Sequence, residues 1–423
     1  MKRVELAYGR SGLSVEVSPD ADVIEPRFVA GLSDEADAIR TALRTPTAGN
    51  ALRDRVPRGA SVGISVCDVT RPFPGRRVLP ILVEELQSWG CGPITLFIAT
   101  GTHRACTPAE LHQMLGANLQ HDCRVVQHDA FDAARHRQVG TVLDTATPVL
   151  VESKFLDQDV RITTGFIEPH FFAGFSGGPK MVAPGLAALE TVLELHSAAR
   201  IAHPCATWGV TQDNPVHAAV RAIAAQVGVT FNLDVTLNRD HAITNVFSGE
   251  LVSSHAAGCK FARATAMAPV RAAYDVVLTT NSGYPLDQNL YQSVKGMSAA
   301  AQIVKPGGSI VIASECSDGL PAHGGYQDLL RQAVDPAAFL AKLFEPDFAA
   351  HDQWQVQVQA QIQRKAHVFV KADGLSADEV RGAWFEPVED VGECVQACLT
   401  AAGPGARLAV LPQGPQTIPY VAE

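Results

Sequence analysis

The chain has 423 residues and a formal net charge of −10 at pH 7, with 47% hydrophobic and 18% charged residues. This length predicts two or three domains, and the composition is that of a folded protein rather than a disordered one. The acidic balance excludes a nucleic-acid partner, because binding a phosphate backbone requires clustered lysine and arginine.

Other whole-chain features predict a cytoplasmic protein. No apolar run approaches the roughly 18 residues that a membrane span requires, which excludes a membrane partner. The first residues, Met1 to Glu5, lack the apolar stretch of a signal peptide. The cysteines are scattered from Cys67 to Cys398 without a CxxC pair, a pattern typical of reduced thiols.

The first half of the chain alternates short apolar runs with helical patterns. Residues 60–67 form a nearly continuous apolar run, as expected for a strand buried on both faces, and residues 94–99 form the next strand. Thr107-Pro108-Ala109-Glu110 is a helix-start signal. We further predict helices over 77–89, 186–197, 216–226 and 254–264, and strands over 149–151 and 160–164. Strands separated by helices in this way favour right-handed crossovers and a parallel sheet.

A second alternating series begins near residue 270, with strands expected over 275–280, 309–313, 368–370 and 407–411. We therefore predict two α/β domains with mainly parallel sheets, over residues 1–270 and 271–423. The active site is expected in the cleft between these domains, and the last residues are able to pack back on the first one.

Polar clusters follow three of the predicted strands, which is where ligands bind in open α/β sheets. The clusters are Asp68-Val69-Thr70-Arg71-Pro72, Thr100-Gly101-Thr102-His103-Arg104 and the stretch from Gly165 to Lys180. They supply Arg71, His103, His170 and Lys180. Each of these residues alone has an ordinary structural explanation, such as a capping arginine, a core histidine or a solvated lysine. Their joint occurrence at equivalent strand ends predicts a shared site.

Glycines Gly174, Gly177 and Gly178 precede Lys180. Their backbone amides could hold a nucleotide phosphate, since glycine permits close approach and positive φ angles, although a turn without a ligand has the same pattern. The loop is neither a GxGxxG nor a Walker motif. The chain also lacks the HExxH motif of zinc hydrolases and the GxSxG elbow of serine hydrolases.

The motifs DxTRP, GTHR and EPHxxxGFSGGxK, followed by Pro184-Gly185 and His196, resemble the nickel-dependent lactate racemase family. Two later motifs, Tyr291-Gln292-xx-Lys295-Gly296 and Asp352-Gln353-Trp354, extend the resemblance over about residues 60–360. The resemblance implies a nickel-pincer nucleotide, a pyridinium mononucleotide whose thioamide and thiocarboxylate arms hold nickel. This cofactor would be covalently linked to Lys180, and His196 would be a nickel ligand, which suits square-planar nickel(II).

The same resemblance assigns the remaining roles. His103 and His170 would be the paired acid/base groups in the first domain. Arg71, Gln292 and Lys295 would hold the substrate's carboxylate and oxygen atoms, with Tyr291 and Trp354 completing the substrate site from the second domain. Binding of the cofactor is assigned to Asp68, Thr70, Gly174, Gly177 and Gly178.

The implied activity is racemisation or epimerisation of a 2-hydroxy acid, lactate or a larger analogue. It would proceed by proton-coupled hydride transfer to the cofactor through a 2-keto acid intermediate. The expected partners are the small-molecule substrate and the proteins that build the cofactor. Two alternatives stay open: an NAD-dependent hydroxy acid dehydrogenase, disfavoured by the missing GxGxxG, and a non-catalytic cofactor-binding protein, disfavoured by the histidine pair.

Overall fold

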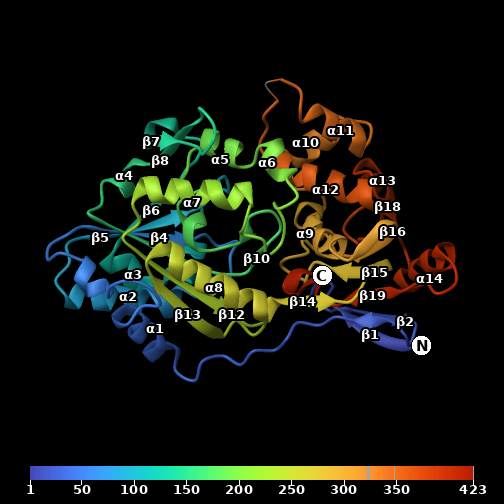
Figure 1. Cartoon of the computed structure of the whole chain (residues 1–423), viewed down its shortest axis with the longest axis horizontal. Helices are drawn as coiled ribbons and strands as arrows, with labels where there is room; N and C mark the ends of the chain where they lie inside the picture. The colour runs from blue at the N-terminus through green and yellow to red at the C-terminus, as the bar shows by residue number, and fades with distance from the viewer. Residues whose placement is uncertain (322–323, 347, 423) are drawn as a thin grey trace. The chain divides into compact units, whose positions relative to one another are not determined.

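The computed structural model describes residues 1–321, 324–346 and 348–422. They form two compact units, each a mixed α/β structure (Figure 1). The larger unit comprises Phe28–His196 and His203–Thr265, and the smaller unit comprises Met1–Arg27, Ser197–Ala202 and Ala266–Glu423.

The larger unit is built on a six-stranded sheet of order β13-β12-β9-β4-β5-β6. The strands β12 to β6 are parallel, and β13 joins antiparallel at one edge. The strands that precede the three polar clusters, β4, β5 and β9, are neighbours in this sheet, so their carboxyl ends meet at one edge. In chain order the elements are α1 (Glu35–Arg44), η1 (Leu52–Arg55), β4 (Val62–Cys67), α2 (Gly75–Ser88), β5 (Ile94–Ala99), α3 (Pro108–Asp122), β6 (Arg124–Gln127), η2 (Ala133–Arg135), β7 (His136–Thr141), β8 (Pro148–Glu152), α4 (Ser153–Leu156), β9 (Val160–Phe166), β10 (Pro169–His170), β11 (Gly174–Phe175), η3 (Gly178–Met181), α5 (Leu189–Leu195), α7 (Pro215–Val227), β12 (Phe231–Leu237), β13 (Ile243–Gly249) and α8 (Leu251–Ala266).

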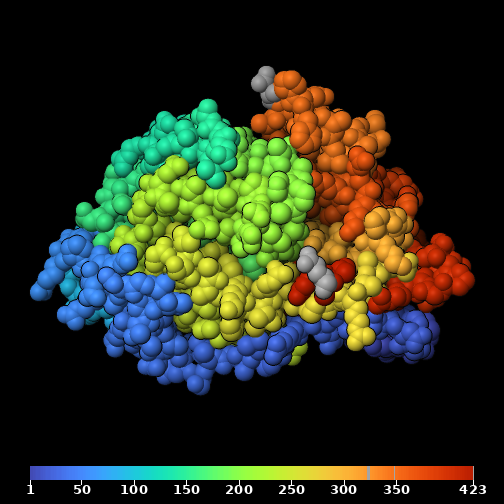
Figure 2. Space-filling view, in the orientation of Figure 1, coloured from blue at the N-terminus to red at the C-terminus, as the bar shows by residue number. Residues whose placement is uncertain are grey.

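Helices cover both faces of this sheet. On one face α1, α2 and α3 bury their apolar side chains against alternate strand residues, among them Ile64, Leu96 and Ile162. On the other face lie η3, α7 and α8 (Figure 1). Figure 2 shows the side chains of α7 and α8 at the surface of this unit.

Local chemistry explains several of these boundaries. Thr107 and Glu110 form the predicted capping box at the start of α3, where each side chain satisfies a backbone N–H. The side chain of Asn214 caps α7, and Pro215 occupies its first turn. Gly228 ends α7 in the left-handed conformation that glycine adopts without strain.

Three strands of the larger unit differ from the sequence-based expectation. The strand predicted over 149–151 is β8, which pairs antiparallel with β7 in a separate two-stranded hairpin rather than extending the parallel series. Strands β12 and β13 were not predicted. In β12, Phe231, Leu233 and Val235 face the apolar core, while Asn232 and Asp234 are buried on the opposite face.

The smaller unit contains a parallel sheet of order β18-β17-β16-β15-β19-β3. The β1–β2 hairpin and α14 pack on one face, and α9 and α12 lie on the other. Its elements are β1 (Lys2–Leu6), β2 (Leu13–Val17), β3 (Asp22–Val23), α6 (Ala198–Ile201), β14 (Met267–Val270), β15 (Tyr274–Thr280), α9 (Leu290–Ala301), β16 (Val304–Ala313), α10 (Tyr326–Leu330), α11 (Pro336–Lys342), α12 (Gln353–Lys365), β17 (His367–Lys371), α13 (Ala377–Gly382), β18 (Glu386–Pro387), α14 (Val391–Ala402), β19 (Leu408–Leu411), η4 (Gly414–Gln416) and β20 (Ile418–Val421).

Both ends of the chain lie in the smaller unit. Residues Met1–Arg27 had been placed in the first domain from the sequence, but β3 adds to the edge of the smaller unit's sheet beside β19. The final strand β20 pairs in parallel with β14 of the same unit. In the part of the chain that the structure describes, no helix is both long and apolar enough to cross a membrane.

Candidate active site

The segment that carries Lys180 is fixed to the carboxyl ends of the central strands. The Ser65 hydroxyl of β4 donates to the backbone carbonyl of Met181 at 2.6 Å. After β5, the Gly101 N–H donates to the carbonyl of Gly185 at 3.0 Å. Lys180, which lies in η3, is therefore held beside the strand ends from which the first two polar clusters emerge.

The first two polar clusters meet in a carboxylate–imidazole pair. Nδ1 of His103 lies 2.7 Å from Oδ2 of Asp68, and Thr70 donates its hydroxyl to Oδ1 of the same carboxylate at 2.6 Å. The Asp68 side chain is 4% exposed and that of His103 43%, so a buried acid orients an accessible ring. Burial by itself raises the pKa of Asp68, but hydrogen bonding and charge from His103 and the charge of Arg71 leave that pKa below its usual value.

Asp68 and Thr70 had been assigned to cofactor binding from the sequence. Their side chains form hydrogen bonds to each other and to His103, and their backbone carbonyls accept from Arg71. An Nδ1–H held by a carboxylate leaves the lone pair of His103 on Nε2, the arrangement expected of a general base.

The third polar cluster gathers its functional side chains around Phe172. Nε2 of His170 lies 3.0 Å from Nζ of Lys180, and the ring of Phe172 packs edge-on against that of His170 at 4.6 Å. The same Phe172 ring lies 5.5 Å from Nζ of Lys180 and 5.1 Å from the ring of His196. We call His170, Phe172, Lys180 and His196 the Phe172 cluster.

The tautomer of His196 suits a metal ligand. Its Nδ1–H donates to the backbone carbonyl of Val192 at 2.7 Å, which places the lone pair on Nε2. Such an outer hydrogen bond is the usual support of a metal-binding imidazole. Among the described residues no group of three or more His, Cys, Asp or Glu side chains could hold a metal ion.

The three glycines before Lys180 are required by packing. All three have positive φ, and a Cβ on Gly174 would lie 2.2 Å from the carbonyl oxygen of Val210. A Cβ on Gly178 would lie 2.5 Å from the ring of His255. The Gly178 N–H, predicted as part of a phosphate nest, donates to the buried carboxylate of Asp234 at 3.0 Å.

The predicted substrate-binding residues of the smaller unit lie on α9 and α12. Nζ of Lys295 donates to Oε1 of Gln292 at 2.9 Å, one helical turn away. The Tyr291 hydroxyl donates to Oδ1 of Asp352 at 3.3 Å. Trp354, near the start of α12, is 7% exposed.

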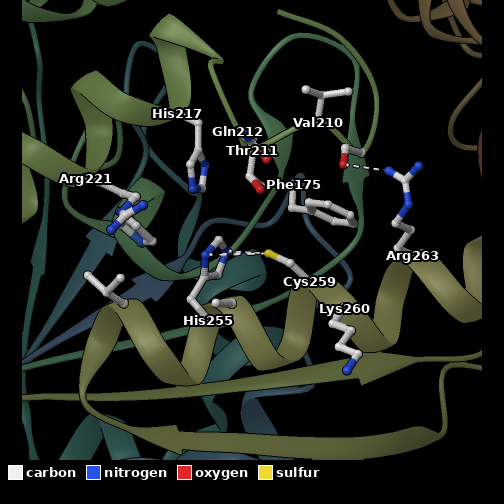
Figure 3. Close-up of a pocket in the computed structure, with 14 residues that line it drawn as sticks. Phe175, Val210, Thr211, Gln212, His217, Arg221, His255, Cys259, Lys260 and Arg263 are labelled. Atoms are coloured by element: carbon white, nitrogen blue, oxygen red, sulfur yellow. Dashed lines mark hydrogen bonds between the residues drawn. The ribbon is translucent and has the colours of Figure 1, made fainter. Parts of the chain in front are cut away.

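The sequence analysis missed a group of side chains between α7 and α8. They line a cavity of about 390 Å³, together with the loop around Thr211 and with Phe175 and Pro179 (Figure 3). The missed side chains are His217 and Arg221 on α7 and His255, Cys259 and Arg263 on α8. The sequence feature that could have identified them is their four-residue spacing within each helix, which places them on one helix face.

Comparison with known proteins identifies the family. Residues 8–209 match the family model of the lactate racemase N-terminal domain, and residues 270–418 match that of the lactate racemase C-terminal domain. The lactate racemase of Thermoanaerobacterium thermosaccharolyticum is 33% identical over 99% of both chains. That of Lactiplantibacillus plantarum is 31% identical over 90% of both chains.

Solved structures agree with these matches. The structure of the lactate racemase apoprotein from T. thermosaccharolyticum has a TM-score of 0.92 and 32% identity, covering 99% of this chain and 100% of its own. A Thermotoga maritima protein has a TM-score of 0.71 at 18% identity, covering 93% of this chain and 100% of its own, and shows the fold alone.

The matches to both family models and to lactate racemases over nearly the full length of the chain define a protein of the isomerase class. More particularly, the chain belongs to the lactate racemase family, so the predicted family and the predicted isomerase class are confirmed.

Proposed function

We propose that this protein racemises or epimerises a 2-hydroxy acid, lactate or a larger analogue, through a 2-keto acid intermediate. The observation that carries the proposal is the arrangement of its two histidines. His103 is oriented by a buried carboxylate at 2.7 Å, and His170 lies 3.0 Å from the amine of Lys180. Inversion through a 2-keto acid requires hydride to return to the opposite face of the planar carbonyl carbon, and the hydroxyl proton to be removed and restored, which two separate imidazoles can do.

The Phe172 cluster supports a tethered cofactor. Lys180 would carry the nickel-pincer nucleotide through an amide-type link, and Nε2 of His196 would be the protein ligand to nickel. When bound, this group supplies the hydride acceptor and donor for the substrate carbon. The apolar ring of Phe172 contacts the side chains of His170, Lys180 and His196, so all three share one hydrophobic neighbour.

The chain's own residues perform the proton chemistry and the binding. His103, held through Nδ1, takes the hydroxyl proton of one enantiomer at Nε2, and His170 returns a proton when the other enantiomer forms. Arg71 lies next to the Asp68–His103 pair, where its guanidinium can bind the substrate carboxylate through two hydrogen bonds. On α9, Gln292 and Lys295 present an amide and an ammonium group for the substrate's oxygen atoms.

The experiment that tests this proposal measures the intact mass of the protein, its nickel content and its racemase activity. The protein is coexpressed with the cofactor-building proteins, and intact mass and nickel content are compared for the wild type and Lys180→Ala. A nucleotide-sized mass increase with one nickel, absent from Lys180→Ala, is expected. Interconversion of D- and L-lactate and of larger 2-hydroxy acids is then followed by chiral chromatography.

The alternatives give different results in the same experiment. Absence of the adduct and of nickel, with activity that depends on added NAD, would establish a dehydrogenase and overturn the proposal. Adduct and nickel without turnover of any 2-hydroxy acid would indicate a cofactor-binding protein.

A further inference from the structure

The cavity between α7 and α8 has a strongly positive lining. Arg221, Lys260 and Arg263 contribute cations, and no aspartate or glutamate lines the cavity, although the chain as a whole has a net charge of −10. Among the described residues, no acid forms an ion pair with Arg221. This charge distribution favours a small anion.

The inner wall of the cavity is formed by two buried imidazoles. The rings of His217 and His255 stack with centroids 5.9 Å apart. His255 donates Nε2–H to the carbonyl of Ser176 at 2.8 Å, and its Nδ1 lies 3.6 Å from the thiol of Cys259, so its ring is fixed. Burial, together with the charges of His255 and Arg221, lowers the pKa of His217 to about 4. The His217 ring is therefore a neutral hydrogen-bonding wall at pH 7. Burial also lowers the pKa of His255, against the charge of Asp234, which raises it.

The three cationic side chains of the cavity point in different directions. Figure 3 shows Arg221 beside the two imidazoles at one end of the cavity and Arg263 at the other, while Lys260 points away from the rings. Arg221 is close enough for its charge to lower the pKa of both His217 and His255. Arg263 donates to the carbonyl of Gly209 at 3.0 Å. Arg221 is thus the principal candidate for an anion contact, with Thr211 on the facing loop.

We propose that this cavity binds a phosphate group, either free phosphate or the phosphate of a small ester, with Arg221 as its main ligand. A guanidinium group offers two parallel N–H donors to phosphate oxygens. A volume of about 390 Å³ accommodates a phosphate with a small organic substituent. This phosphate site is independent of the racemase activity proposed above.

The site is next to the segment that carries Lys180. Pro179 lines the cavity, and Gly178 packs against the ring of His255. The charge of Lys180 also acts on the pKa of both histidines. An anion bound here would contact the segment that contains η3. Because this segment carries Lys180, the phosphate has two candidate sources: the ribose phosphate of a nucleotide attached to Lys180, or a separate metabolite.

The test uses the full-length protein without cofactor, titrated calorimetrically with inorganic phosphate at constant ionic strength. Binding with a dissociation constant below about 10 mM is expected. Arg221→Gln should weaken it at least about tenfold, and Lys260→Gln less than about threefold, because the Lys260 ammonium points away. Arg53→Gln, an exposed residue of the same unit outside the cavity, is the matched control and should bind like the wild type.

A second titration, with nicotinate mononucleotide, distinguishes the two sources of the phosphate. This compound is a pyridinium mononucleotide with one phosphate group. If it displaces phosphate, binds more tightly and loses affinity in Arg221→Gln, the cavity holds the nucleotide's phosphate. If phosphate binds and the mononucleotide does not displace it, the ligand is a separate phosphate. The proposal is overturned if phosphate does not bind, or if Arg221→Gln and Arg53→Gln bind it equally.

Discussion

Oδ2 of Asp68 accepts a hydrogen bond from Nδ1 of His103 at 2.7 Å, across two loops that follow adjacent parallel strands. Asp68 is almost fully buried and His103 is accessible, so the carboxylate fixes the orientation of an imidazole that is open to solvent. This relationship leads to the first prediction.

Asp68→Asn should lower kcat by a factor on the order of 10² to 10⁴, because the amide no longer holds the tautomer with its lone pair on Nε2. Nickel and nucleotide content should be unchanged, and both are measured with the initial rate of racemisation. Glu110→Gln removes a carboxylate from an exposed pair with Arg104 in the neighbouring loop and is the control. A loss of less than threefold in Asp68→Asn would show that the pair does not orient the base.

His196→Ala should abolish nickel binding while the nucleotide stays attached to Lys180. The reason is that His196 is the imidazole of the Phe172 cluster that we propose as the nickel ligand, whereas the link that we propose to Lys180 is covalent and does not depend on it. Intact-mass spectrometry and elemental analysis separate the two properties, and the exposed His121→Ala is the control. Stoichiometric nickel in His196→Ala would assign the metal ligand elsewhere.

Gly178→Ala should destabilise the protein by about 2–5 kcal/mol, measured by chemical denaturation. Its φ is +48°, and the added Cβ would lie 2.5 Å from the buried His255 ring. Gly59→Ala isolates the backbone contribution, since Gly59 also has positive φ but no atom within 4 Å of a Cβ. It should cost only about 1–2 kcal/mol. Equal costs at the two positions would mean that His255 moves aside freely.

Arg135→Gln should destabilise the protein by about 3 kcal/mol at pH 7, because Glu152 would keep a buried charge without its guanidinium partner. Nη2 of Arg135 lies 2.8 Å from Oε2 of Glu152, whose side chain is 1% exposed. Arg137→Gln, which removes an exposed pair with Asp157, should cost less than about 1 kcal/mol.

The contribution of Glu152 to stability at neutral pH should become smaller in this variant. In the wild type, burial raises the pKa of Glu152, but His128 and Arg135 lower it by more, so the net pKa is below its usual value. The carboxylate therefore contributes stability above its unfolded pKa of about 4.3, and this contribution is lost as pH falls. Without Arg135 only His128 opposes the effect of burial, so the pKa of Glu152 should be higher than in the wild type and the variant's deficit should shrink as pH is lowered toward that pKa. Parallel stability curves would contradict this account.

The sequence predicted the parts of the fold that depend on local chemistry. The fully buried strands β4 and β5 are continuous apolar runs, and the start of α3 is encoded by Thr107, Pro108 and Glu110 within four positions. Strand β12 was not predicted because two of its buried positions, on the face opposite the apolar core, hold Asn232 and Asp234. Their hydrogen bonds, to Ser254 and to the Gly178 amide, come from residues far along the chain.

The sequence by itself determined the chemical groups of the site, because the motifs around Asp68, His103 and His170 each follow an apolar strand. Only the tertiary structure decided which groups meet. The neighbouring positions of β9, β4 and β5 bring Asp68 to His103, and the fold of the third cluster brings His170, Lys180 and His196 around one phenylalanine ring. The tertiary structure likewise decided that Met1–Arg27 belongs to the smaller unit and that a cavity forms between α7 and α8. Strand order and side-chain pairing depend on contacts between distant residues, which local patterns of polarity do not specify.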